Sequence, residues 1–148
     1  MAFKTENELN NFDFNDSTLI EVQKGLSTYK LIISDVHILP ENSANRDIRT
    51  MRTNDLELSF TDGKLEKLIE EGYSLLDVNE KPYKEVPDKI VDESEYEEVF
   101  KKLQETRVDT IEAREGGYDV VIRDEDHTWR MQFSGSGDVE KWERFLNL

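Results

Sequence analysis

Cysteine is absent from this chain of 148 residues, and histidine occurs only as His37 and His127. The absence of cysteine excludes a disulfide framework, a thiol nucleophile and cysteine-ligated zinc, and it is typical of proteins from a reducing compartment. No stretch approaches the roughly 20 apolar residues of a membrane helix, and the first residues lack the apolar run of a signal peptide. The length suits one domain, so we expect a single cytoplasmic domain over residues 1–148 that binds no membrane.

Basic residues are in the minority, with 19 Lys and Arg against 34 Asp and Glu, and the net charge is −15. A field of this sign repels phosphate backbones, so we expect no nucleic-acid ligand. The same field attracts a basic protein partner and can raise the rate of association with it. The alternative is that the acidic surface only keeps the protein soluble.

Two stretches of the chain resemble each other, residues 18–35 and residues 109–124. In each of them, apolar residues alternate on both sides of a turn, which predicts a β-hairpin. A third alternating run follows each stretch, at residues 56–60 and 129–133, and predicts a third strand. The chain therefore contains an internal repeat.

A helix is predicted after each third strand, because the apolar residues there have helical spacing. These residues are Leu65, Leu68 and Ile69 in the first copy and Val139, Trp142, Phe145 and Leu146 in the second. One such unit is too small to stand alone. We therefore predict an α+β fold in which two internal β-β-β-α repeats pack into one domain, as antiparallel meanders with helices on one side.

The predicted divisions are repeat one at about 18–72, a connector at about 73–107 and repeat two at about 109–148. In the connector, Pro82 and Pro87 favour an extended path, and the pattern that follows predicts a helix at about 93–105. Residues 36–55 have no counterpart in the second copy. Their Asn, Ser and Pro content predicts a loop.

Two stretches contain residues that bind ligands in other proteins. The glycine-rich segment 134–138 precedes a predicted helix, where free N–H groups bind phosphate, but Asp138 stands in the place of the anion. We therefore expect a capped turn there. The turn at residues 124–127 contains carboxylates and an imidazole, which are metal ligands, but it lacks the spacing of a calcium loop. We expect no metal and no cofactor.

Motifs of catalysis are missing as well. The sequence contains no nucleophile elbow, no serine-triad pattern and no dinucleotide fingerprint. General acid–base catalysis needs a carboxyl with a shifted pKa, usually in a cleft, and no Asp or Glu stands in a convincing apolar stretch. We therefore expect that the protein is not an enzyme.

Two groups of charged residues are candidates for binding a partner. The acidic candidates are Asp92, Glu93, Glu95, Glu97, Glu98, Asp124, Glu125 and Asp126. The first five also oppose the dipole of the predicted connector helix, so a stabilising role competes with binding. Arg46, Arg49 and Arg52 recur in the insertion and could bind an anion or a carboxylate of a partner, or could simply balance nearby acids.

The opening FDFNDSTLIEV, Phe12 to Val22, resembles the start of many small bacterial proteins in which an aromatic residue and an Asp-Ser pair lead into a meander. Several such groups are similar to immunity proteins, which are encoded beside secreted polymorphic toxins and bind them. The resemblance covers about the first third of the chain, and asparagine stands where such openings often carry histidine. It implies a protein partner and no catalytic residues.

The leading hypothesis is a non-catalytic binding protein of the immunity or inhibitor type that occludes a basic toxin with its carboxylates. The alternative is a self-associating structural or scaffold domain, whose partner is another copy and which forms a homo-oligomer.

Overall fold

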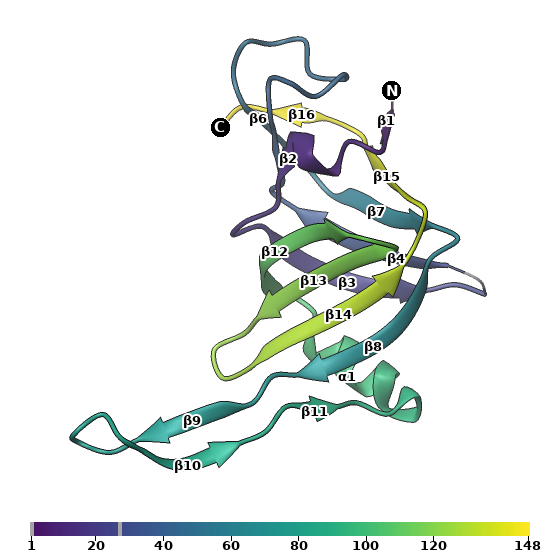
Figure 1. Cartoon of the computed structure of the whole chain (residues 1–148). Helices are drawn as coiled ribbons and strands as arrows, with labels where there is room; N and C mark the ends of the chain where they lie inside the picture. Colours follow the sequence, from purple (N-terminus) through teal and green to yellow (C-terminus); the bar gives the residue numbers. More distant parts are fainter. Residues whose placement is uncertain (1, 27) are drawn as a thin grey trace.

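Strands dominate the computed structural model, which describes residues 2–26 and 28–148 (Figure 1). The strands up to residue 70 are β1 Phe3–Glu6, β2 Phe12–Asp13, β3 Thr18–Lys24, β4 Tyr29–Ser34, β5 His37–Ile38, β6 Met51–Thr53, β7 Leu56–Thr61 and β8 Lys64–Glu70. The later strands are β9 Tyr73–Leu76, β10 Pro82–Val86, β11 Lys89–Ile90, β12 Thr106–Arg114, β13 Gly117–Arg123, β14 Thr128–Ser134, β15 Gly137–Trp142 and β16 Phe145–Leu146. The helical segments are η1 Leu9–Asn11, η2 Glu93–Glu95 and α1 Tyr96–Lys102.

The predicted α+β class is wrong. Strands account for 54% of the structure and helical segments for 9%, so the fold is mostly β. The segments that were expected to be helices on one side of the meanders form β8 and β15 of the main sheet and β16 of a small second sheet. α1 is the one α-helix among the described residues.

The main sheet is antiparallel, in the order β1-β15-β7-β4-β3-β12-β13-β14-β8-β11. Because β8 continues β7 after a two-residue turn and β15 continues β14 in the same way, each pair forms one long bent strand. The two bent strands pair along their length, from Lys141 opposite Glu57 to Trp129 opposite Glu70. The sheet therefore closes on itself as a ring of two bent strands with β4, β3, β12 and β13 (Figure 1).

The two stretches that resemble each other in sequence have matching places in this ring. One contributes β3, β4 and the bent strand β7–β8, and the other contributes β12, β13 and the bent strand β14–β15. Both belong to one sheet, where β3 pairs with β12 and the two bent strands pair with each other.

Large apolar side chains fill the interior of the ring. Among the most buried are Leu19, Leu31, Ile33, Leu56, Leu58, Val108, Val120, Ile122, Met131 and Phe133. At one end, Phe100 of α1 lies against Tyr29 with 6.1 Å between ring centres. At the other end, a small sheet in the order β16-β6-β5-β2 covers the ring, and Phe12 lies edge-on to Trp142.

A β-bulge explains why β8 resembles a helix in sequence. Leu65 pairs with Phe133 and Lys67 with Gln132, which leaves Glu66 as an extra residue. Since a bulge shifts the alternation of side chains by one position, Leu65 and Leu68 face the same side although they are three residues apart. Spacing by three is the helical signature, and here a strand produces it.

Buried acids explain why β15 also resembles a helix in sequence. Asp138, Glu140 and Trp142 alternate along the strand on its buried side, where apolar residues would be expected. The remaining apolar positions, Val139 and Trp142 in β15 and Phe145 in the separate strand β16, are spaced by three. No helix follows the glycine-rich segment 134–138, in which residues 135–136 form a bend between the end of β14 and the start of β15.

Candidate functional site

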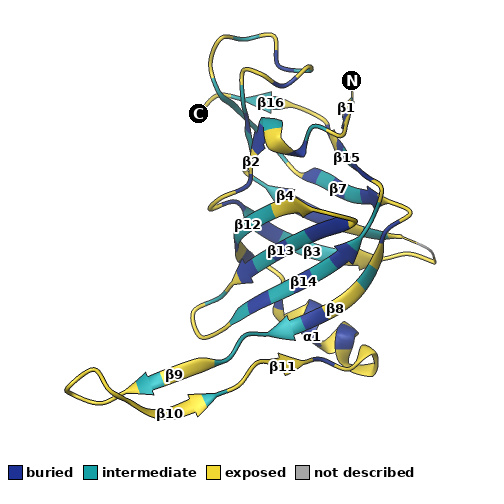
Figure 2. Cartoon of the chain, in the orientation of Figure 1, coloured by how far each residue is buried: buried dark blue, intermediate teal, exposed yellow. Residues whose placement is uncertain are grey.

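A hairpin projects from the body of the molecule beyond the end of β8 (Figure 1). Its strands β9 and β10 pair only with each other, and most of its residues are exposed (Figure 2). We call residues 73–90 the arm, which comprises this hairpin and the short strand β11 at its base, where Lys89 and Ile90 pair with β8. Five of the eight large hydrophobic side chains that are exposed in the described part of the chain belong to it, with exposed fractions from 53% to 98%: Tyr73, Leu76, Val78, Tyr83 and Ile90.

Local hydrogen bonds shape the arm. At its tip, the carboxylate of Asp77 accepts from the backbone N–H groups of Asn79 and Lys81, at 2.8 and 3.0 Å. At its base, the N–H of Gly72 donates to Asp88 at 2.6 Å. A Cβ at Gly72 would lie 2.0 Å from the carbonyl oxygen of Val86, so only glycine fits where the two chains of the arm approach each other.

The arm differs from the body in charge. It contains four acidic and three basic residues, for a net charge of −1, which leaves −14 on the rest of the chain. Its surface is therefore nearly neutral and rich in apolar groups, whereas the body is strongly acidic.

The first acidic cluster lies directly after the arm. It consists of Asp92, Glu93, Glu95, Glu97 and Glu98, and all five residues are exposed. Tyr96 and Val99, on the opposite side of the same segment, are buried and hold it against the ring. Lys89 of β11 reaches Glu95 at 4.0 Å, so this acidic helix cluster adjoins the base of the arm.

The second acidic cluster is the turn between β13 and β14, with Asp124, Glu125 and Asp126. Although burial opposes it, the backbone N–H groups of Asp126 and His127 lower the pKa of the Asp124 carboxyl. His127 lies 3.3 Å from Glu70 at the end of β8, beside the other flank of the arm's base. The structure thus places both predicted acidic clusters at one end of the molecule, with the base of the arm between them (Figure 1).

The predicted arginines lie at the opposite end, next to the small sheet (Figure 1). Arg49 is held by Asp47 at 3.0 Å, and Arg52 is held by Asp35 at 3.0 Å. The ion pairs of Arg49 and Arg52 fit the alternative in which these arginines balance nearby acids. Arg46 makes no ion pair within residues 2–26 and 28–148 and lines a pocket instead.

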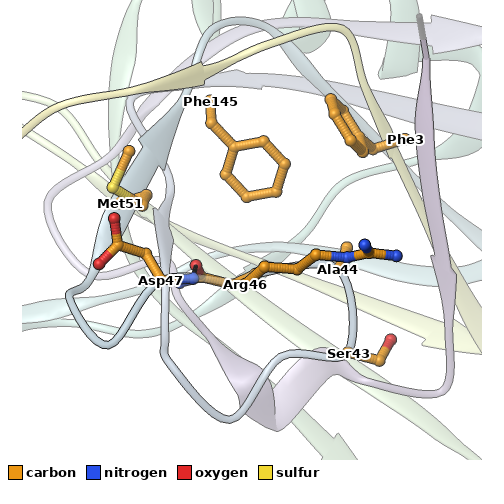
Figure 3. A pocket seen from close by; sticks show the side chains of 8 residues that line it. Phe3, Ser43, Ala44, Arg46, Asp47, Met51 and Phe145 are labelled. Carbon is orange, nitrogen blue, oxygen red and sulfur yellow. Dashed lines mark hydrogen bonds between the residues drawn. The ribbon is translucent and has the colours of Figure 1, made fainter.

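That pocket has a volume of about 660 Å³ and lies between the insertion and the two ends of the chain. In Figure 3, the rings of Phe3 and Phe145 lie on one side of it and the side chain of Arg46 extends across the other. Met51 and Asp47 line the pocket at the left of the view.

Two carboxyls are buried in the interior. Asp138 is 5% exposed and Glu140 is 0% exposed, although a turn was predicted for the segment that ends at Asp138. Tyr118 donates to Asp138 at 2.8 Å and Thr5 donates to Glu140 at 2.8 Å. Burial and the neighbouring carboxyl of Asp138 raise the pKa of Glu140 to about 9.

The raised pKa favours the protonated form of Glu140. One oxygen of each carboxyl lacks a hydrogen-bond partner among the described groups, and a proton shared between Asp138 and Glu140 would satisfy both. At these exposures neither carboxyl is open to a substrate, and the pair belongs to the packed interior beside β15. The pair was not foreseen, because a single sequence does not distinguish a buried acid from an exposed one.

The arm was also missed. Tyr73 and Leu75 alternate before the turn residues Asp77 and Asn79, which indicates the first strand of a hairpin. Tyr83 and Val86 on the other side are three residues apart, and the two strands shift register between Pro82 and Lys84. Pro82 and Pro87 of the connector predicted an extended path instead. Pro82 is compatible with the hairpin because β10 has a free edge, where a missing N–H does no harm.

Other kinds of site receive no support from the geometry of residues 2–26 and 28–148. Nowhere in them do three His, Asp or Glu side chains gather closely enough to hold a metal ion. None of their helices has the length and apolar character needed to cross a membrane. Comparisons of the chain with protein-family models, with curated proteins and with solved structures gave no match.

Proposed function

We propose that this protein is a non-catalytic binding protein that occludes a basic protein partner, in the manner of an immunity or inhibitor protein. The observation that carries the proposal is the arm, which exposes apolar side chains between two acidic clusters. A two-stranded hairpin alone is at best marginally stable in water, and exposed apolar patches typically mark interaction surfaces. The apolar groups of the arm therefore need the surface of a partner.

The partner is basic because of the charges around the arm. With −14 on the body and acidic clusters on both flanks, the molecule attracts positive surfaces and orients them toward this end. The arm itself has a net charge of −1, so its contact surface desolvates few uncompensated charges.

Binding in this arrangement has two parts. Tyr73 and Tyr83 are large side chains with a polar tip, of the type that dominates the binding energy of protein interfaces. They and Leu76 would fill an apolar cavity of the partner, while the acidic clusters contact basic groups around it. Because the body lies directly behind the arm, it would cover the partner's surface and exclude other ligands from it.

The test compares three variants with the unmodified chain as baits for proteins of the native host, at low and at high salt. The arm variant carries Leu76→Ser and Tyr83→Ser, and the charge variant carries Glu95→Lys, Glu97→Lys and Glu98→Lys. The matched control reverses three exposed acids away from the arm, by Asp55→Lys, Glu112→Lys and Glu115→Lys.

We expect the unmodified chain and the control to retain the same basic protein at low salt. With that protein purified, the arm variant should dissociate at least about tenfold faster, and the charge variant should associate about tenfold more slowly at low salt. Equal retention by the arm variant would contradict the proposal. Recovery of the bait alone, together with a concentration-dependent dimer in sedimentation, would assign the arm to a second copy of the chain and overturn the foreign partner.

A further inference from the structure

We propose that the pocket at the end opposite the arm is a binding site for a small carboxylate with an aromatic body. The aromatic ring would lie against Phe3 and Phe145, and the carboxylate would pair with Arg46 (Figure 3). The volume of about 660 Å³ lies in the range of ligand pockets, about 300 to 1,000 Å³. This inference does not depend on the proposed function, because it concerns other residues at the other end of the molecule.

The pocket is built from additions to the ring. Phe3 comes from the first strand of the chain, residues 43–51 come from the insertion, and Phe145 comes from the last strand. None of these segments belongs to the strands that close the ring, and the insertion has no counterpart in the second half. Three segments far apart in sequence thus converge on one cavity.

Its apolar wall is a rigid group of rings. Phe3 and Phe145 meet edge to face with 4.7 Å between their centres, and both also contact the buried Trp142, at 5.8 and 5.6 Å. Phe3 and Phe145 are only partly buried, so they present apolar surface to the pocket. An aromatic ligand would extend this group with the same edge or stacked contacts.

The loop that forms the other wall is held in place before any ligand arrives. Asn45 is 8% exposed, and its side-chain amide donates to three backbone carbonyl oxygens at 3.1 to 3.2 Å, those of Ile38, Leu39 and Arg49. The carboxylate of Glu8 accepts from both the N–H and the hydroxyl of Ser43. A pre-formed wall lowers the entropy cost of binding a small ligand.

The charge of Arg46 selects the ligand. Asp47, the acid that lines the pocket, is paired with Arg49. The hydrogen bonds from Arg49 lower the pKa of the Asp47 carboxyl. Arg46 has no carboxylate partner in the described part of the chain, although the chain carries 34 acidic residues. Its guanidinium is therefore the free charge of the pocket, and a carboxylate is the group that guanidinium binds in bidentate geometry.

The experiment is an NMR titration of the full chain with 3-phenylpropanoate and with its uncharged amide, 3-phenylpropanamide. We expect 3-phenylpropanoate to bind with a Kd on the order of 0.1 to 1 mM, the affinity of a good ligand of its size. The shifted amide signals should lie in residues 43–51 and at Phe145. The amide compound should bind at least about tenfold more weakly, because it lacks the charge that Arg46 recognises.

Arg46→Gln should weaken binding of 3-phenylpropanoate at least about tenfold, and Arg46→Lys should retain part of it. Arg144→Gln is the matched control, because it removes an exposed arginine near the same end that does not line the pocket, and it should change the Kd less than about twofold. Equal binding of the two probes, or an unchanged Kd in Arg46→Gln, would overturn the carboxylate site. Shifts confined to residues outside the pocket would overturn its location.

Discussion

The ring and the arm are built from the same kind of antiparallel pairing, yet the ring buries its apolar side chains and the arm exposes them. Leu58, Met131 and Phe133 of the ring are at most 1% exposed, whereas Val78 and Tyr83 of the arm are 98% and 66% exposed. A ring of strands encloses its own core, and a two-stranded hairpin has no face on which to bury one. The difference indicates that the arm adds little buried apolar surface to the fold, and that its apolar side chains are available for binding.

Replacement of an interior aromatic tests the ring side of this comparison and should have the largest effect. Phe133→Ala removes a buried ring that contacts Tyr29 and Phe60, and it should lower the free energy of unfolding by about 3 to 5 kcal/mol. Tyr83→Ala in the arm should change it by less than about 0.5 kcal/mol. Urea unfolding of both variants measures the contrast, and equal losses would show that the arm belongs to the core.

The buried carboxyl pair predicts how the stability of the ring depends on pH. The pKa of Glu140 is raised to about 9 in the folded protein, so the folded state keeps a proton that the unfolded chain releases near its ordinary value of 4.5. The contribution of Glu140 to the free energy of unfolding is therefore complete below pH 4.5 and is lost as the pH rises toward 9. Over that range the free energy of unfolding falls by up to about 1.4 kcal/mol per pH unit.

Glu140→Gln isolates this contribution, because glutamine remains neutral and can still donate a hydrogen bond to Asp138. The difference in unfolding free energy between the unmodified chain and Glu140→Gln should shift in favour of the variant as pH rises from 5 to 9. Asp138 and Glu8, which raise the pKa of Glu140, and Tyr118, whose pKa Glu140 helps to raise, are present in both proteins. Parallel stability curves would mean that Glu140 is not protonated in the fold.

The base of the arm should show an intermediate effect. Gly72→Ala places a Cβ 2.0 Å from the carbonyl oxygen of Val86 and should cost about 1 to 3 kcal/mol, mainly by separating the two chains of the arm. Gly116→Asn is the control, since Gly116 has φ of 77° and open space around it, and asparagine tolerates this conformation. Faster amide exchange in residues 73–90 of Gly72→Ala, with unchanged exchange in β13, is the expected result. Uniform acceleration over the whole chain would contradict it.

The smallest effect on stability is expected from the double variant Leu76→Ser and Tyr83→Ser. Both side chains are exposed, so the free energy of unfolding should stay within about 0.5 kcal/mol of that of the unmodified chain. Thermal and urea unfolding measure it. A larger loss would mean that the arm packs on the body, and the contrast between the two regions would then disappear.

The sequence predicted the strands of the ring where side chains alternate without interruption. Leu56, Leu58 and Phe60 in β7 and Trp129, Met131 and Phe133 in β14 lie in strands and are buried as their pattern indicated. β8 and β15 could not be predicted in this way, because a bulge at Glu66 and buried acids at Asp138 and Glu140 replace the alternation by a spacing of three.

The candidate sites depended on pairing that a single sequence does not determine. Residues 92–98 and 124–126 are far apart along the chain, and they flank one arm only because β8 lies between β14 and β11. Arg46, Arg49 and Arg52 have the same residue type and regular spacing, but Asp47 and Asp35 neutralise two of them and leave one to line a pocket. Charge spacing shows which residues are available, and tertiary contacts decide which remain free.

The central claim is that the arm is the surface that contacts a partner. Hydrogen exchange of the free protein and of its complex with the captured partner, compared peptide by peptide, tests it most directly. We expect fast exchange over residues 73–90 in the free protein and strong protection of the same residues in the complex, with little change in β13 and β14. Unchanged exchange of the arm, with protection elsewhere on the body, would contradict it.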